Sequence, residues 1–569
     1  MCLYINFKHM KYLISILFVC SLFGFKNFFY DEEDWFIIKR PGSINSITDN
    51  SFSVYFGTDN GIFEYDKMYE ELKYNHIMTS GLPNDKISHI FYDTYSDHFW
   101  IAHSDGISYK SSISINYRDI TWGDLGRNGI NFIDDIGSTS SHIWIRSGNL
   151  FVSFNPFNGK PDATYYDDFY DKDMIEWGSS VYGIKGENID ISQYYIHSKK
   201  NWMIGYNVTS HNGVVVDRGI FIDEMGRHIN PTVFHKDRDH NIWFGTDRGV
   251  LLHGSEYSYR LNIADIGLYS DIISNAYVDS SSVWWFFDSQ YNRKGEQKDD
   301  PYRKFEGDDI FLTMWDEKNN SWRNFDISES TTIKSGDLND VLRVEENIFM
   351  ATMYGVVIYN TISDSWDIID VNDGLNSNSI WDLILYQDVI FILTSEGINE
   401  LDINQLLVIP DPNGIYQKLE NKKIYDMCKV DNNFLISTNS GIFKLDYHEK
   451  RISFLQPYLC YQIEGDEEEQ FCLNNQIWSL DLLDNENPED PDVIHDEFSR
   501  NFSISDGYMW INQTNDVKLL EIDTKKSWIY SIEDGLPGNN IFHVDCDDEW
   551  AWFITNDGIA LYNWRKYHD

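Results

Sequence analysis

Basic residues are scarce in this sequence compared with acidic ones. Lys and Arg together number 45 against 91 Asp and Glu, which gives a formal net charge of −46 at pH 7. Such a charge keeps a protein soluble and repels phosphate backbones, so we expect no nucleic-acid partner. Acidic surfaces also occur on proteins that face salt water or divalent cations, so the charge by itself identifies no ligand.

The local motifs of common enzyme classes are also absent. The sequence contains no HExxH, no GxSxG, no Walker loop and no dinucleotide fingerprint. The segment DRDHN at 237–241 begins like a calcium loop, but Ile242 stands where that loop needs Gly and Arg248 where it needs an acid. We read it as a hairpin turn. We therefore predict no catalytic residues, no metal and no cofactor, in a protein that is not an enzyme.

Cysteine is rare and unpaired in the sequence. Only Cys428, Cys460, Cys472 and Cys546 follow the N-terminal segment, with no CxxC pair, so no zinc site is expected. Cys460 and Cys472 flank an acidic loop at 464–469. A disulfide there would contribute roughly 3 kcal/mol in the chain-entropy description, but four unpaired core thiols fit the sequence equally well.

The N-terminus predicts export. Lys8, His9 and Lys11 precede a charge-free apolar run of 14 residues, from Tyr12 to Phe25. Such a run is short for a membrane span and typical of a signal-peptide core. We predict that residues 1–25 are a signal peptide or an N-terminal anchor, which would be the protein's one membrane attachment. Cleavage, lipidation and retention stay open. The exported chain would be periplasmic, outer-membrane-associated or secreted.

One stretch, residues 80–110, sets the organisation of the chain. A GLPN turn leads into the alternating strand pattern of Ile87–Phe91, and a polar break leads into a second strand, Phe99–Ala102. After a second turn at Gly106 a third strand begins. Three short antiparallel strands in about thirty residues form most of a propeller blade.

The stretch recurs with a regular period. DGLNSN at 373–378 and DGLPGN at 534–539 each lead through strand patterns to a Gly-containing turn. Gly61 to Gly106 spans 45 residues, Gly355 to Gly397 spans 42, and Gly397 to Gly441 spans 44. A period in the low forties with one hairpin-rich unit per period is typical of propeller blades.

These segments also resemble a known family. GLPND…HFWIAHSDGIS and DRDHNIWFGTDRGV are similar to the two-component-regulator propeller repeat, whose pattern is roughly GLPSN…I…D..G.LWIGT..GL. Related repeats build the paired propellers of periplasmic sensor proteins and of a type IX secretion accessory protein. The resemblance implies the fold and says little about the ligand. No kinase or DNA-binding module follows the repeats, so a sensor role would require a separate kinase.

The predicted fold is all-β, with about 11 or 12 four-stranded blades in tandem β-propellers, two rings packed together. Trp35–Ile38 resembles the outer strand of a blade, and the C-terminal unit lacks that strand. We therefore expect the termini to meet in one blade. The first propeller would comprise residues 30–230 plus about 500–569, and the second about 231–499, with a contiguous split near 330 as the alternative.

The predicted function is that of a binding or scaffold protein of the cell envelope, with a protein or glycan partner. Its alternatives are the input domain of a separate two-component kinase and a propeller lyase or glycosidase acting on polysaccharide. A long polar insertion holds the densest basic cluster, and we predict that it binds an anionic partner on one rim. That cluster consists of Arg293, Lys294, Lys298, Arg303 and Lys304.

Overall fold

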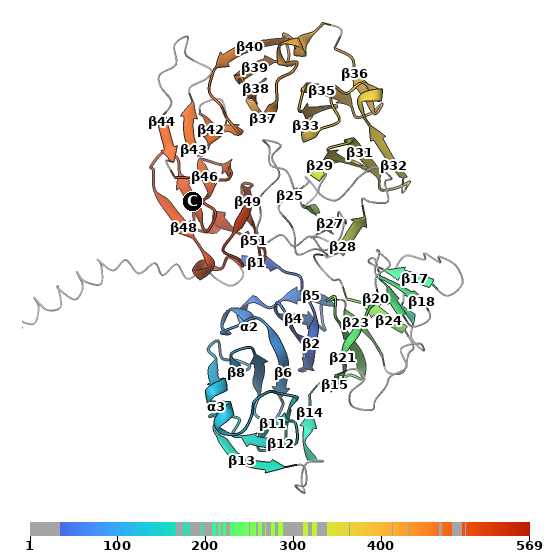
Figure 1. Cartoon of the computed structure of the whole chain (residues 1–569), viewed down its shortest axis with the longest axis vertical. Helices are drawn as coiled ribbons and strands as arrows, with labels where there is room; N and C mark the ends of the chain where they lie inside the picture. Colours follow the sequence, from blue (N-terminus) through green and yellow to red (C-terminus); the bar gives the residue numbers. More distant parts are fainter. Residues whose placement is uncertain are drawn as a thin grey trace, which may run out of the picture.

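The chain folds into β-sheets arranged as two rings (Figure 1). This computed structural model describes residues 35–166, separate segments between 174 and 326, and residues 338–568 apart from gaps at 364, 412, 431, 466–468, 481–491 and 496. The described residues form twelve sheets, ten of which have four strands. The prediction of tandem β-propellers with 11 or 12 blades is confirmed. The N-terminal segment, for which we predict a signal or anchor, lies outside the described residues.

The first ring, the lower one in Figure 1, uses strands from β2 to β24. Its strands are β2 (Ile44–Asp49), β3 (Ser53–Thr58), β4 (Gly61–Asp66), β5 (Glu71–Tyr74), β6 (Ile87–Asp93), β7 (His98–His103), β8 (Gly106–Ser111), β9 (Arg118–Thr121), β10 (Asp135–Ser138), β11 (Ile143–Ser147), β12 (Leu150–Phe154), β13 (Pro161–Tyr166), β14 (Glu176–Trp177), β15 (Ser180–Val181), β16 (Tyr195–Ile196), β17 (Val208–His211), β18 (Val214–Asp217), β19 (Ile220–Ile222), β20 (His228–Ile229), β21 (Pro231–Lys236), β22 (Asn241–Thr246), β23 (Leu251–Ser255) and β24 (Arg260–Ile263).

The second ring, the upper one in Figure 1, has seven sheets. Its strands are β1 (Trp35–Ile38), β25 (Asn275–Val278), β26 (Val283–Phe287), β27 (Phe311–Asp316), β28 (Ser321–Asp326), β29 (Leu338–Val344), β30 (Asn347–Thr352), β31 (Gly355–Asn360), β32 (Ser365–Ile369), β33 (Ile380–Tyr386), β34 (Val389–Thr394), β35 (Gly397–Asp402), β36 (Leu407–Ile409), β37 (Ile424–Val430), β38 (Asn433–Thr438), β39 (Gly441–Asp446), β40 (Arg451–Gln456), β41 (Gln462–Gly465), β42 (Gln470–Asn474), β43 (Gln476–Leu480), β44 (Asp492–His495), β45 (Phe502–Ser505), β46 (Tyr508–Asn512), β47 (Val517–Glu521), β48 (Ser527–Tyr530), β49 (Ile541–Cys546), β50 (Ala551–Thr555) and β51 (Gly558–Tyr562).

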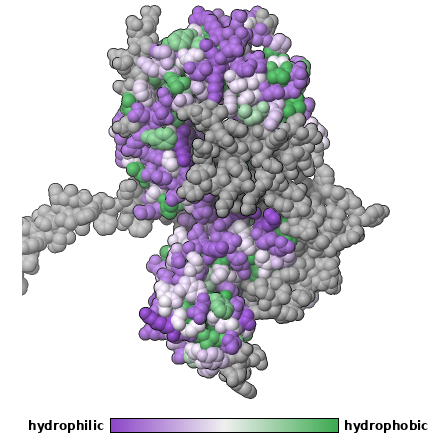
Figure 2. All heavy atoms as spheres, viewed as in Figure 1, coloured by the Kyte–Doolittle hydropathy of each residue, from purple (hydrophilic) through white to green (hydrophobic). Residues whose placement is uncertain are grey.

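Helix is confined to short turns. The α-helices of the described residues are α2 (His76–Ser80) and α3 (Trp122–Arg127), with 3-10 turns such as η5 (Val371–Asp373) and η7 (Ile532–Asp534). Within this described part, no helix has the length and apolar character needed to cross a membrane. The face in Figure 2 is largely hydrophilic where it is coloured, in keeping with the acidic composition.

The second ring is closed by a strand from the N-terminus. β1 pairs antiparallel with β51, placing Trp35 opposite Tyr562 and Ile38 opposite Ile559. The Trp35 ring stacks on the Tyr562 ring at a centroid distance of 4.6 Å. The expected meeting of the termini in one blade is therefore seen. Because one strand from the start of the chain completes a sheet from its end, opening this ring requires breaking a strand pairing.

The division between the rings differs from the one expected. Ile44 and Phe56 of the N-terminal sheet share a core cluster with Val233 and Trp243, so the blade at 231–263 belongs to the first ring. Trp284 packs on Trp552 of the C-terminal blade and Trp315 belongs to the same core cluster, so the blades from β25 onward belong to the second ring. The inserted ring is therefore 44–263, rather than 231–499, and the alternative split near 330 is not seen either. Period and pattern are nearly the same in all blades, so they do not show which blades are neighbours.

Each blade is held to the next by polar side chains on its innermost strand. In seven of the innermost strands the register shifts at the second residue, which leaves that residue as a bulge. Bulged Asn45 donates to the carbonyl of Ile87 in the next blade at 2.9 Å, and Asn339 donates to that of Ile380 at 2.7 Å. These bonds tie the bulge of one innermost strand to the start of the next innermost strand.

The recurrent Gly ends a tight hairpin between the two middle strands, at the same end of the blade as the bulge. In five blades a Thr hydroxyl donates to the carbonyl of the Gly three residues later, as Thr352 does to Gly355 at 2.7 Å. Gly355 has a φ of +124°, and a Cβ there would lie 2.4 Å from the carbonyl oxygen of Ile369. The repeat needs Gly because both the backbone angle and the approach of the outer strand exclude a side chain.

The first ring is closed by side chains, since its described strands show no exchange with a terminus. The Nζ of Lys67 lies 3.2 Å from Asp49, 3.8 Å from Asp237 and 2.8 Å from Asp239, which joins the blade of β2 to that of β21. The Nε2 atom of His235 also forms a hydrogen bond with Asp49 Oδ1 at 3.0 Å. Burial opposes ionisation of Asp49, but His235 and Lys67 outweigh it and lower the pKa of this carboxyl. The Lys67 ammonium thus balances the charge of the carboxylates around it, as a bound metal ion would.

We expect Gly355→Ala to destabilise the chain severely, because the new Cβ meets the Ile369 carbonyl oxygen at 2.4 Å. Gly507→Ala is the matched control: Gly507 has a similarly positive φ of +78° and nothing within 4 Å. The control should cost only the left-handed backbone penalty, about 1–2 kcal/mol. Urea unfolding measures both. Equal losses would show that the close approach at Gly355 does not matter.

We expect Lys67→Met to cost about 3–5 kcal/mol, because it leaves the carboxylates of Asp49 and Asp237 buried without their cation. The control is Lys86→Met, whose Nζ is 4.0 Å from Asp59 in an exposed pair and should cost at most about 1 kcal/mol. Thermal unfolding in low salt compares them. A Lys67→Met variant as stable as the control would contradict ring closure through this cluster.

Candidate functional site

The predicted basic binding loop is not part of the described structure. Arg293, Lys294, Lys298, Arg303 and Lys304 all lie outside the described residues. Their role on a rim stays a prediction.

One end of the channel of the second ring gathers polar and aromatic side chains from successive blades. β29, β33 and β37 are innermost strands, and their first residues lie at the same end of the channel because the blades are equivalent (Figure 1). The third residue of each strand is an acid: Asp340, Asp382 and Asp426. Adjacent bulge positions hold Trp381 and Tyr425. We call this group, with Lys423 and Tyr461, the channel rim.

Asp340 and Asp382 form a close carboxyl pair. The backbone N–H of Leu383 donates to Asp340 Oδ2 at 3.0 Å and to Asp382 Oδ1 at 2.9 Å, so both carboxyls converge on one nitrogen. Burial raises the pKa of Asp340 well above 3.8, and the Asp382 carboxylate and its hydrogen bond to Asp340 raise it further. Among the described residues no cation forms an ion pair with either acid. Burial and the neighbouring Asp382 carboxylate therefore favour the protonated form of Asp340.

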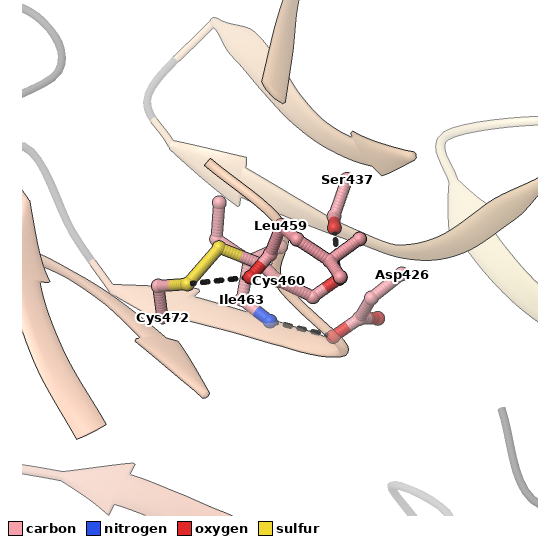
Figure 3. The surroundings of a disulfide bond; sticks show 6 residues. All are labelled: Asp426, Ser437, Leu459, Cys460, Ile463 and Cys472. Carbon is pink, nitrogen blue, oxygen red and sulfur yellow. Dashed lines mark hydrogen bonds between the residues drawn. A yellow bond between two sulfur atoms is a disulfide. The ribbon is translucent and has the colours of Figure 1, made fainter. Parts of the chain in front are cut away.

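Asp426, at the same position one blade on, is satisfied differently. Its two carboxylate oxygens accept the backbone N–H groups of Met427 at 2.9 Å and of Ile463 in the next blade at 2.8 Å. Figure 3 shows this contact beside the disulfide. The same sequence position thus gives an acid bonded to backbone in one blade and an acid pair in the preceding two.

Three aromatic rings and one cation complete the channel rim. Lys423 Nζ lies 5.3 Å from the ring centroid of Trp381 and 5.6 Å from that of Tyr425. Tyr425 meets Tyr461 of the next blade edge to face, with centroids 5.3 Å apart. Trp381 is 7 % exposed, and its indole N–H has no hydrogen-bond partner among the described residues. Cation–π contacts of this kind fix the Lys stem across the rings and hold the aromatic faces in place.

The structure resolves the open question of the cysteines. Cys460 and Cys472 form a disulfide with a Cα–Cα distance of 5.4 Å, next to the channel rim blade of Tyr461 (Figure 3). Ser437 of the neighbouring blade donates to the carbonyl of Cys460 at 2.5 Å. Cys428 and Cys546 stay free, and burial raises the pKa of both thiols, which keeps them protonated and unreactive.

The Trp residues of the repeats and the DRDHN segment have the structural roles that the sequence predicts. Trp100, Trp243 and Trp552 are at most 4 % exposed, so they belong to the core rather than to a sugar-stacking surface. Asp237 caps the hairpin turn of DRDHN by accepting N–H groups of Asp239 and Asn241. Within the described ranges no group of three or more His, Cys, Asp or Glu is arranged to hold a metal.

The channel rim was missed in the sequence, although a signal exists. Asp340, Asp382 and Asp426 each stand 15 residues before the recurrent glycines Gly355, Gly397 and Gly441. Aligning the repeats on those glycines brings the three acids into one column. Their different hydrogen-bond partners could not be read from that column, because the partner residue belongs to the neighbouring blade.

Comparison with known proteins finds similarity to solved structures alone. No protein-family model matches the chain, and no curated protein matches it. Among solved structures, PorZ, a surface component of the type-IX secretion system of Porphyromonas gingivalis, is 11 % identical over 93 % of this chain and 87 % of its own, with a TM-score of 0.48. The extracellular domain of the one-component system BT4673 from B. thetaiotaomicron is 15 % identical over 95 % and 78 %, with a TM-score of 0.33.

A third structure, the WD40 domain of Pan2 from Neurospora crassa, is 11 % identical over 51 % of this chain and 89 % of its own, with a TM-score of 0.36. The first two are of the kinds that the repeat motifs resembled, a type IX secretion component and the extracellular domain of a sensor. At these identities and scores the likeness concerns the fold, which the sheet topology establishes independently.

We expect Asp340→Asn to flatten the dependence of stability on pH. In the folded chain the pKa of Asp340 is raised, so the stability contributed by its proton is fully present below about pH 3.8 and is lost as pH rises through the folded pKa. The Asn variant cannot ionise, so it should melt above wild type at pH 8 and approach it on acidification. Calorimetry between pH 4 and 8 measures this difference.

Asp426→Asn is the matched control in the next blade. Its amide can accept only one of the N–H groups of Met427 and Ile463, so it should cost about 1–3 kcal/mol with little change between pH 6 and 8. If Asp340→Asn is destabilising at pH 8 in the same way, the raised pKa of Asp340 is contradicted.

Proposed function

We propose that this chain is an exported, non-enzymatic binding protein of the cell envelope, which recognises a protein or glycan partner at the channel rim of its second ring. One observation carries the proposal: aromatic side chains from three successive blades converge at one end of the channel, held by a Lys between them. Binding sites are commonly concave, aromatic-lined and equipped with a few fixed polar groups.

The channel rim offers two kinds of contact. Half-buried Tyr425 and Tyr461 present ring faces for stacking against sugar rings or for packing against an apolar side chain of a partner. The ammonium group of Lys423 offers a donor within the same group. Trp and Tyr are among the residue types that contribute most to binding energy at protein interfaces.

The acid pair favours binding over glycoside cleavage. Paired catalytic carboxyls of glycosidases stand about 5–5.5 Å apart in retaining enzymes and farther in inverting ones. Asp340 and Asp382 instead hydrogen-bond to each other and share the N–H of Leu383. The clustered carboxyls and Tyr425 still make a propeller lyase or glycosidase the rival to be tested.

Export is supported by the disulfide and by the N-terminal sequence. The Cys460–Cys472 bond lies in the buried core of a blade, and disulfides of this kind persist in oxidising compartments such as the periplasm and the exterior. The apolar run at 12–25 predicts the same route. A sensor input for a separate kinase would place the chain in the same compartment.

The test compares Tyr425→Ala and Lys423→Ala with wild type in pull-downs from envelope extract and on a glycan array. Each substitution should weaken capture of the partner about tenfold, since an aromatic or cation–π contact at a hot spot is worth about 1–2 kcal/mol. The measurement is the captured amount as a function of immobilised protein.

The matched control is Phe454→Ala, on the outer strand of the same blade and 52 % exposed. It should leave capture unchanged. Equal binding by all variants would contradict the channel rim as the site, and turnover of any glycan on the array would favour the enzymatic rival.

A further inference from the structure

Seven large hydrophobic side chains are exposed at one end of the first ring. In a four-stranded antiparallel blade, the turn after the first strand and the turn after the third strand lie at the same end. The seven side chains occupy such turns in four blades, and we call them the turn face: Phe52 (78 %), Met68 (82 %), Tyr69 (75 %), Tyr95 (54 %), Ile113 (91 %), Phe157 (62 %) and Tyr257 (78 %), with the exposed fraction in brackets.

The turns that carry these residues contact one another, so the turn face is continuous across blades. The N–H of Lys67 donates to the carbonyl of Phe52 at 3.0 Å, and Lys67 Nζ reaches Asp239 at 2.8 Å in the next blade. On the other side the rings of His98 and Phe157 meet edge to face at 5.6 Å. Because neighbouring turns touch, their exposed tips share one side of the ring.

Three of these turns are uncharged although the chain carries −46, whereas exposed Glu70 and Asp97 lie near Tyr69 and Tyr95 in two other turns. The segments NSFS at 50–53, SSISINY at 111–117 and NPFNG at 155–159 contain no charged residue. The corresponding turns of the second ring are acidic, with Glu345, Glu346, Asp388, Asp506, Asp547, Asp548 and Glu549 exposed. In those described turns Ile362 is the exposed large hydrophobic residue. The apolar character therefore belongs to the first ring and is not a property of propeller turns as such.

The high exposed fractions indicate which kind of partner fits. A side chain that is more than 70 % exposed has little contact with its own protein, so it protrudes instead of lining a groove. Protruding apolar tips suit a soft medium that closes around each of them, whereas a rigid protein partner would need a matching hole for each.

We propose that the turn face seats the first ring on a lipid bilayer with electrically neutral head groups. Aromatic and aliphatic tips insert at the boundary between head groups and acyl chains, where Trp, Tyr and Phe side chains are favoured. A second copy of this chain and an anionic bilayer are both disfavoured occupants, since the chain's charge of −46 repels them. This inference does not depend on the channel rim, which lies in the other ring.

The experiment is flotation with zwitterionic phosphatidylcholine vesicles, using the chain from residue 26 onward so that the N-terminal apolar run is absent. Wild type should float with the vesicles. The variant Phe52→Ser/Tyr69→Ser/Tyr257→Ser should partition at least tenfold less. Raising the salt concentration should not weaken flotation, because apolar insertion is not screened as Coulomb attraction is.

The matched control is Ile362→Ser/Leu407→Ser, two exposed residues of the second ring that should leave flotation unchanged. Thermal unfolding shows whether the variants fold, and Met68→Ser/Tyr95→Ser provides a second variant of the turn face. Wild type that stays in solution, or floats equally well with the turn face substituted, overturns the proposal. Substitutions that instead abolish a dimer in sedimentation would assign the face to a second copy and overturn it as well.

Discussion

The whole architecture depends on how one blade is bonded to the next. A blade is a small twisted sheet that buries its faces only against neighbours, so a ring forms when every inner strand finds a partner on both sides. Here a bulge turns the second residue of most inner strands toward the following blade. Asn45 and Asn339 donate from that position to the carbonyls of Ile87 and Ile380. The third residue then faces the next blade's backbone N–H.

That third position is where structure and candidate function meet. Ser46 fills it in the first ring and exchanges hydrogen bonds with the backbone of Ile90. Asp426 at this position accepts hydrogen bonds from two backbone donors. Asp340 and Asp382 in adjacent blades converge on one donor, and burial together with Asp382 raises the pKa of Asp340. A position selected for joining blades thus places a half-buried carboxyl pair at the channel wall, beside the aromatic residues Trp381 and Tyr425 at the bulges.

The two rings are closed by different kinds of interaction. In the second ring β1 pairs with β51, and the buried stacking of Trp35 on Tyr562 supports the closure with backbone hydrogen bonds and aromatic packing. In the first ring, at the contact of the blades of β2 and β21, a Lys ammonium binds three carboxylates. The linker residue Lys39 joins both rings, since its Nζ lies 3.1 Å from Asp557 and 3.5 Å from Asp85. Ionic contacts of this kind depend on desolvation and geometry more than on area.

The sequence by itself determined the blade and its count. The period of the glycines, the alternation of strands such as Ile87–Phe91, and the orphan strand at Trp35 predicted the propellers and the meeting of the termini, because these depend on local geometry and period. Only the tertiary structure decided which blades form which ring and how Asp340, Asp382 and Trp381 are placed. Those outcomes rest on contacts between blades, such as Ile44 with Val233 and Trp284 with Trp552, and near-identical repeats do not encode their own neighbours. The disulfide between Cys460 and Cys472 likewise required the strand register that brings the two residues together.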